Sequence, residues 1–81
     1  MNQTEIFQAV AAIMRETLGL PELVVTPETS ATDVEEWDSM SHIQLIVAIE
    51  AKFKVRFDLR ELRTLKNVGD MIELIAKKLN G

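Results

Sequence analysis

Three polar side chains lie close together near the middle of the chain and could take part in chemistry. Asp38 and Ser39 are adjacent, and His42 follows Ser39 by three residues, which is close to one helical turn. A serine, a histidine and an aspartate in contact could form the catalytic triad of a hydrolase. They could equally mark a helix start at which the Ser39 hydroxyl carries a phosphate ester, since a helix N-terminus favours anions.

The hydrolase hypothesis has little else in the sequence to support it. There is no Gly-x-Ser-x-Gly motif, and the three glycines are isolated, so no glycine-rich turn supplies an oxyanion hole. Asp38 is better suited to be a helix N-cap, whose carboxylate accepts a hydrogen bond from the backbone N–H of Met40 or Ser41. We expect no catalytic residues and an exposed His42. One histidine without cysteine also cannot form a zinc site, so no metal is expected.

The run Asp38-Ser39-Met40-Ser41-His42-Ile43-Gln44-Leu45-Ile46-Val47-Ala48-Ile49-Glu50-Ala51-Lys52-Phe53 continues this motif. It resembles the Asp-Ser-Leu motif and the following helix of acyl carrier proteins, with Met40 in place of the usual leucine. The resemblance extends from about Glu5 to Leu79. It is fairly specific because motif, helix order, spacing and chain length all agree.

The resemblance implies that Ser39 carries covalent 4′-phosphopantetheine, added from coenzyme A by a phosphopantetheinyl transferase, with Asp38 as the cap beside the site. The thiol of this arm would hold acyl groups as thioesters and deliver them from an acyl-loading enzyme to acyltransferases or synthases. His42 could contact the phosphate of the arm or a partner. One face of the helix would dock partners and the other would face the core. The predicted docking residues are Met40, Ile43, Val47, Glu50, Glu35 and Glu36. The residues expected to face the core are Leu45, Ile49 and Phe53, whose apolar stripe Ile46 joins.

The helix after Ser39 is expected to end at Phe53 or Lys54, and it is apolar on two stripes. The periodicity leaves open whether both stripes are core. A first helix over about residues 3–18 is predicted by a capping box of Asn2 and Glu5 and by Gly19 at its end.

The segment between these helices, from Leu20 to Trp37, has no sustained period and contains two prolines. We expect a long loop, since no second strand is available to pair with a short one. Such loops in small domains are functional or packed by their own side chains. The apolar residues that could attach it to the core are Leu23, Val24, Val25, Val34 and Trp37.

Two further helices are predicted toward the C-terminus. Asp58 and Glu61 form a capping box for a short helix from Leu59 to Leu65, and Asn67 and Asp70 form one for a helix from about Val68 to Leu79. The expected fold is all-α: a small bundle of three longer helices and one short helix, with a long loop between the first two.

Composition limits the protein to a small module. The 81 residues suit a single domain, residues 1–81, with little room for a deep cleft. Without cysteine, any thiol must come from a cofactor. No signal peptide or membrane-spanning stretch is evident, and we expect a soluble, cytoplasmic monomer that does not insert into membranes.

The net charge of −4 hides an asymmetry. Residues 1–50 hold nine acidic side chains and one basic side chain, a balance of −8, whereas residues 51–81 hold eight basic and four acidic side chains, a balance of +4. The half that contains Ser39 is therefore acidic. That charge disfavours nucleic acid and suits partners with basic patches.

Departures from the family pattern narrow the expected pathway. The helix after Ser39 has only Glu50 as an acidic residue, unlike the acidic series of fatty-acid synthase carriers, and the Gly-Gly-x-Ser pattern of peptidyl carriers is missing. We expect a carrier in polyketide, modified-lipid or similar specialised synthesis. The alternatives are a helical interaction domain without an arm, an aminoacyl or peptidyl carrier, and a small hydrolase.

Overall fold

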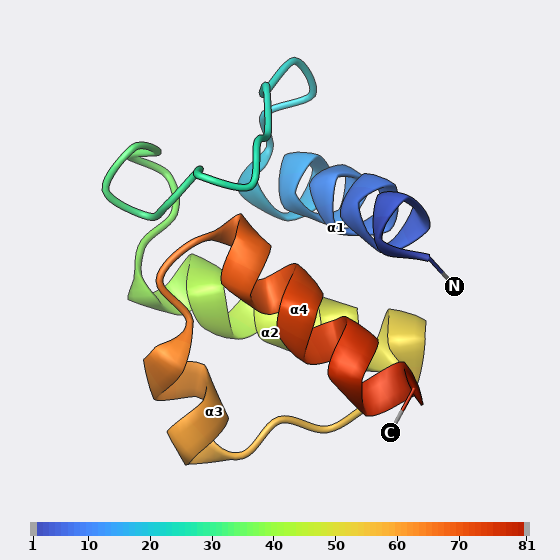
Figure 1. Ribbon diagram of the computed structural model, residues 1–81. Helices are drawn as coiled ribbons and strands as arrows, with labels where there is room; N and C mark the ends of the chain where they lie inside the picture. The colour runs from blue at the N-terminus through green and yellow to red at the C-terminus, as the bar shows by residue number, and fades with distance from the viewer. Residues whose placement is uncertain (1, 81) are drawn as a thin grey trace.

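The computed structural model describes residues 2–80, which form four helices (Figure 1). The helices are α1 (Gln3–Leu18), α2 (Ser39–Phe53), α3 (Leu59–Thr64) and α4 (Val68–Asn80). No strand occurs within residues 2–80. The prediction of an all-α fold with three longer helices, one short helix and a long first loop is confirmed. Each helix end lies within one residue of its predicted position.

The ends of α1 follow from local sequence. The Asn2 side chain accepts a hydrogen bond from the Glu5 backbone N–H (2.8 Å), and the Glu5 carboxylate accepts one from the Asn2 N–H (3.2 Å). At the other end Gly19 adopts the left-handed conformation, with φ 69°. A residue without Cβ takes this conformation with least strain, so the helix ends there.

One hydrophobic core joins α1, α2 and α4, with α1 packed against both of the others. Each helix presents one stripe of apolar side chains at helical spacing to this core. The buried side chains of the three helices are Ile6, Val10, Ala11, Met14, Leu18, Leu45, Ile46, Ile49, Phe53, Val68, Met71, Ile72 and Ile75. This core holds the N-terminus of α2, and therefore Ser39, in a fixed place.

The long loop is attached to the core, although not by every residue that we predicted. Val25, Val34 and Trp37 are buried and Leu23 is half-buried, whereas Val24 is 78% exposed. The prediction for Val24 is wrong because the neighbours Leu23 and Val25 pack against the core, whereas the side chain of Val24 faces solvent.

Backbone hydrogen bonds also fasten this loop to the start of α4. The Val68 N–H donates to the Thr29 carbonyl (2.9 Å), and the Gly69 N–H donates to the Pro27 carbonyl (2.8 Å). A Cβ at Gly69 would lie 3.1 Å from that Pro27 oxygen, so only glycine fits here without a shift. The predicted cap of α4 is formed in part. Asn67 accepts from the Asp70 N–H (2.9 Å), but the Asp70 carboxylate accepts from the Lys66 N–H (3.0 Å) instead of from Asn67.

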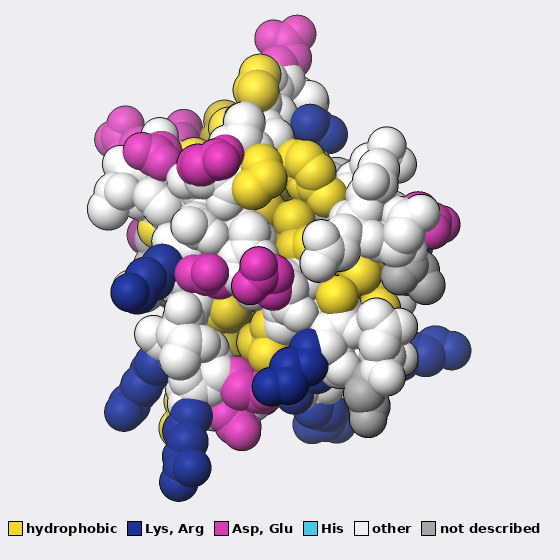
Figure 2. Space-filling model, in the orientation of Figure 1, with side chains coloured by type: hydrophobic (Ala, Val, Ile, Leu, Met, Phe, Trp, Pro, Cys, Tyr) yellow, Lys and Arg dark blue, Asp and Glu magenta, His cyan; other side chains and the backbone are white. Residues whose placement is uncertain are grey.

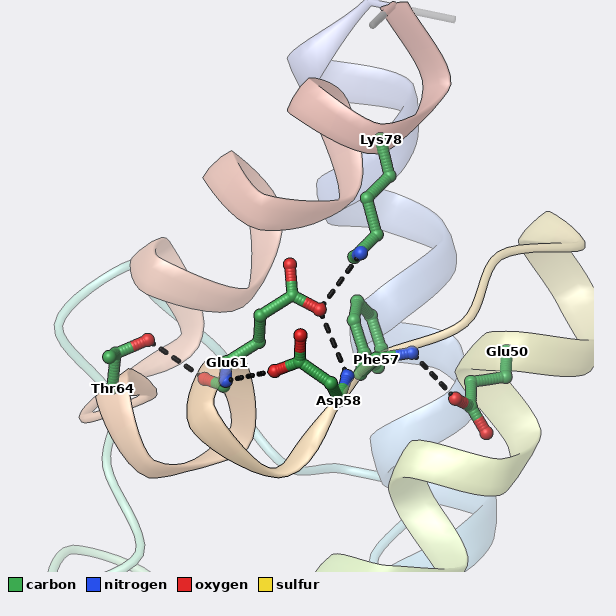
Figure 3. A network of polar contacts seen from close by, with 6 residues as sticks. All are labelled: Glu50, Phe57, Asp58, Glu61, Thr64 and Lys78. Carbon is green, nitrogen blue, oxygen red and sulfur yellow. Dashed lines mark hydrogen bonds and ion pairs between the residues drawn. The ribbon is translucent and has the colours of Figure 1, made fainter.

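The connector after α2 is held by a polar network (Figure 3). The Glu50 carboxylate on α2 accepts a hydrogen bond from the Phe57 backbone N–H (2.8 Å). Asp58 and Glu61 form the predicted capping box of α3, and Glu61 also pairs with Lys78 of α4 at 2.8 Å. The network therefore links the short helix to both α2 and α4.

Lys54 ends α2 in the left-handed conformation, with φ 56°, although it is not glycine. A side chain in this conformation is strained by about 1–2 kcal/mol. We predict that Lys54→Gly stabilises the protein by about 0.5–1 kcal/mol, since glycine removes the strain but is more flexible when unfolded.

Urea unfolding of both proteins would measure this difference. The matched control is Lys52→Gly, the same change at an exposed position within α2, which is expected to lose about 1 kcal/mol. Equal effects of the two substitutions would contradict the role of the left-handed backbone.

Candidate functional site

Ser39 is exposed and is the first residue of α2, as predicted. Asp38 before it is extended and caps the helix, with its carboxylate accepting a hydrogen bond from the Ser41 backbone N–H (2.9 Å). The backbone N–H of Ser41, and after it the Ser41 hydroxyl, donate hydrogen bonds that lower the pKa of the Asp38 carboxyl below its ordinary value. The Asp38 carboxylate beside Ser39 is therefore ionised, and it caps the helix.

A surface hollow opens beside Ser39. Its walls come from three parts of the chain: the long loop, the first turn of α2 and the end of α3. The lining residues are Ala31, Trp37, Asp38, Ser39, His42, Ile43 and Leu65. The sequence did not indicate Ala31 or Leu65 as part of this site, since only the folding of the loop and of α3 brings them beside Ser39.

The side chain of His42 is not exposed as predicted but half-buried against Trp37. The indole Nε1–H of Trp37 donates a hydrogen bond to His42 Nδ1 (3.1 Å), and the two ring planes lie 27° apart with their centroids 6.0 Å from each other. Trp37 itself is only 5% exposed and belongs to the core. Burial lowers the pKa of His42 below its ordinary value of 6.5.

The lowered pKa of His42 predicts that the folded protein is less stable in mild acid. The unfolded chain takes up its proton as the pH falls through about 6.5, before the folded protein does. The contribution of neutral His42 to the free energy of unfolding is therefore fully present above pH 6.5. It decreases as the pH falls below 6.5, until the lower pKa of the folded state is reached.

Thermal unfolding between pH 7.5 and 5 would measure this loss of stability. In the His42→Asn variant the Asn Oδ1 can replace Nδ1 as the acceptor from Trp37, and no group titrates there. We expect its melting temperature to depend less on pH in this window. An identical dependence in both proteins would contradict the assignment to His42.

The three residues do not form a hydrolytic triad. His42 Nδ1 accepts a hydrogen bond from Trp37, so in the neutral ring it has no hydrogen to donate to an aspartate. The Asp38 carboxylate is bound to the Ser41 N–H instead. The geometry therefore gives the hydrolase hypothesis no support.

The two faces of α2 differ in burial in the way we predicted. Leu45, Ile46, Ile49 and Phe53 are buried. On the opposite face Met40, Ile43 and Val47 are 72%, 65% and 58% exposed. Three large apolar side chains on one exposed helix face, next to Ser39, form the kind of surface that contacts other proteins.

The three acidic residues predicted for docking lie in two different environments. Glu35 and Glu36 are exposed in the loop just before Trp37. Glu50 is half-buried, and its carboxylate already accepts a hydrogen bond from the Phe57 backbone N–H. On the face shown in Figure 2, several acidic side chains lie over the long loop, while most of the visible Lys and Arg side chains lie in the lower half of the view.

The residues at this site fit a covalently attached phosphopantetheine. Ser39 is accessible to a modifying enzyme at a helix N-terminus, where a phosphate ester is favoured. The hollow beside it offers apolar walls from Trp37, Ile43 and Leu65. The arm would supply a thiol for thioester chemistry, which this cysteine-free chain cannot supply itself.

Comparison with known proteins identifies the family. Residues 8–75 match the model of the protein family described as "Phosphopantetheine attachment site". The chain is 41% identical to the acyl carrier protein of Acidothermus cellulolyticus over 76 residues, which are 94% of this chain and 90% of that protein. The chain belongs to the acyl carrier protein family.

Other acyl carrier proteins agree with this assignment. The solution structure of a holo acyl carrier protein from Geobacter metallireducens has a TM-score of 0.86 at 46% identity, covering 91% of this chain and 85% of that one. The meromycolate extension acyl carrier protein of Mycobacterium tuberculosis is 34% identical over 95% of this chain and 67% of its own length.

Membership of this family confirms the predicted cofactor and function. The chain is an acyl carrier protein that holds acyl intermediates on covalent 4′-phosphopantetheine. Acyl carrier proteins work with biosynthetic enzymes. These comparisons do not favour the alternative of an interaction domain without an arm. Within residues 2–80 no helix is both long and apolar enough to cross a membrane.

Proposed function

We propose that Ser39 is the residue that bears the phosphopantetheine arm. The observation that carries this proposal is the position of Ser39: exposed, first in α2, directly after the capping Asp38 and beside the hollow. The acyl group would be held on the arm outside the core. The domain, residues 1–81, would catalyse no reaction of its own and would act as a cytoplasmic monomer.

We further propose that the exposed face of α2 docks the partner enzymes. Met40, Ile43 and Val47 would provide the apolar contact, and Glu35 and Glu36 would attract basic patches. Glu50 would lie at the edge of this surface, with its carboxylate partly occupied by Phe57. The partners would be a phosphopantetheinyl transferase, an acyl-loading enzyme, and acyltransferases or synthases.

A specialised pathway, such as polyketide or modified-lipid synthesis, remains our proposal for the biological setting. The support is the charge of α2, on which Glu50 is the only acidic residue. Partners that use this surface would depend more on the apolar contact than on a row of ion pairs along the helix. Partner binding should then depend less on salt than binding through a row of ion pairs would, with Glu35 and Glu36 as the part that salt weakens.

Intact mass after incubation with coenzyme A, Mg²⁺ and a broad-specificity phosphopantetheinyl transferase tests the site. We expect the parent protein to gain one phosphopantetheine and Ser39→Ala to gain none. Ser41→Ala is the matched control, because it removes a hydroxyl two residues away in the same helical turn, and it should still be modified. Modification of Ser39→Ala, or none of the parent while a second carrier reacts in the same tube, would contradict the proposal.

A further inference from the structure

The pair of Trp37 and His42 lies beside the proposed attachment site. His42 follows Ser39 by three residues on α2, so the two side chains leave the helix on the same side. Both residues line the hollow, together with Trp37. They are also the single histidine and the single tryptophan of the chain. A contact between this imidazole and a group on Ser39 is therefore sterically reasonable and can be observed without ambiguity.

The hydrogen bond from Trp37 determines which imidazole nitrogen carries the hydrogen. The indole N–H can only donate, so His42 Nδ1 must be an acceptor with a free lone pair. In the neutral ring the hydrogen is then on Nε2. The hydrogen bond to the buried indole also restricts rotation of the ring. His42 is thus held as a donor with one defined N–H group.

This N–H group is available to a ligand. The imidazole makes no second hydrogen bond within residues 2–80, and no buried side-chain nitrogen or oxygen in that range lacks a partner. Nε2 is therefore open to solvent. The indole N–H is already used, and no lysine or arginine lines the hollow. Apart from the Ser39 hydroxyl, His42 is the side chain of the hollow that has a donor to spare.

A phosphodiester on Ser39 would be stabilised by such a donor, in addition to the backbone N–H groups at the start of α2. It carries a negative charge at neutral pH, and the ionised Asp38 carboxylate next to Ser39 would repel it. A hydrogen bond from a nearby N–H would offset this repulsion and fix the direction in which the arm leaves the helix.

We propose that Trp37 holds His42 as the Nε2–H tautomer and that this N–H donates to the phosphodiester of the arm on Ser39. This inference rests on the proposed function of Ser39. His42 would contact the cofactor, and Trp37 would act through His42 as a positioning residue. The contact would orient the arm before an acyl group or a partner enzyme is present.

The first part of the test needs no arm. Long-range ¹H–¹⁵N NMR of the unmodified protein should show one imidazole, with Nε2 protonated above pH 7. Trp37→Phe keeps an aromatic ring but removes the N–H donor, so the Nδ1–H tautomer should increase and the His42 pKa should rise. A predominant Nδ1–H form in the parent would overturn the proposal, and this result does not require the variant to fold. A folded Trp37→Phe protein with an unchanged tautomer and pKa would overturn the role of Trp37.

The second part compares the protein before and after modification, with intact mass confirming the arm. A phosphodiester in contact should raise the His42 pKa by about 0.5–1 unit. The phosphodiester itself does not titrate between pH 5 and 8. Its ³¹P resonance should nevertheless shift with the midpoint of His42, and this shift should be lost in His42→Gln.

The matched control moves the only imidazole to another position of α2. In His42→Gln combined with Gln44→His, the ring occupies an exposed position that does not line the hollow, and its pKa should not respond to the arm. Full modification of the parent without any change in His42 or ³¹P titration would overturn the contact. Failure of Ser39 to be modified would instead overturn the proposed function, which the mass shows separately.

Discussion

Ile49→Ala is expected to lower the free energy of unfolding by about 2–5 kcal/mol. Ile49 lies at the centre of α2 with 0% of its side chain exposed, packed in the core that joins α1, α2 and α4. Removing three buried carbons loses their transfer free energy and leaves a cavity that the helices fill only in part. A domain of this size has a total stability near the lower end of about 5–15 kcal/mol, so the loss is severe.

The matched control is Ile43→Ala, the same substitution on the opposite face of the same helix. Ile43 is 65% exposed, so its loss of stability should stay within about 0.5 kcal/mol. Urea unfolding would measure both, and the midpoint of Ile49→Ala should fall by about 1–3 M. Similar losses in the two variants would show that α2 is not oriented as described.

The sequence predicts the helices of this protein well because their ends are marked by local chemistry. Asn2 with Glu5, Asp38, and Asp58 with Glu61 each satisfy backbone groups within one turn, so no distant contact is needed to locate them. The position of Ser39 at the start of α2 follows directly. Its exposure and its place at the head of a helix were therefore predictable.

Contacts between distant segments could not be predicted in the same way. The periodicity of α2 shows two apolar stripes, and only the resemblance to the family indicated which one faces the core. The path of the long loop decides that Val24 faces solvent and that Trp37 turns its N–H toward His42. Leu65 lines the hollow, and only the folded position of α3 brings it there.

Ile43→Lys combined with Val47→Lys is expected to lower kcat/KM of the phosphopantetheinyl transferase by about 10–100-fold. The two side chains form an exposed apolar surface one turn apart, and Ile43 also lines the hollow beside Ser39. Docking residues of this kind contribute more than about 1 kcal/mol each, and tenfold in rate corresponds to about 1.4 kcal/mol. Lysine also repels a basic partner.

Folding should change little in this double variant, because both positions are exposed and lysine is a good helix former. The control is Gln8→Lys combined with Ala12→Lys, which adds the same charge at the same spacing to exposed positions of α1.

Initial rates at several carrier concentrations would give kcat/KM, with urea unfolding in parallel. An equal loss of kcat/KM in both double variants would mean that the added charge, and not the exposed face of α2, determines recognition by the transferase. An unchanged kcat/KM in the α2 variant would place the docking surface elsewhere. The expected results for the two faces of α2 are opposite. Ile49→Ala lowers the free energy of unfolding, whereas Ile43→Lys with Val47→Lys lowers the transferase rate and leaves the free energy of unfolding nearly unchanged. This contrast would assign stability to the buried face of α2 and partner recognition to the exposed face.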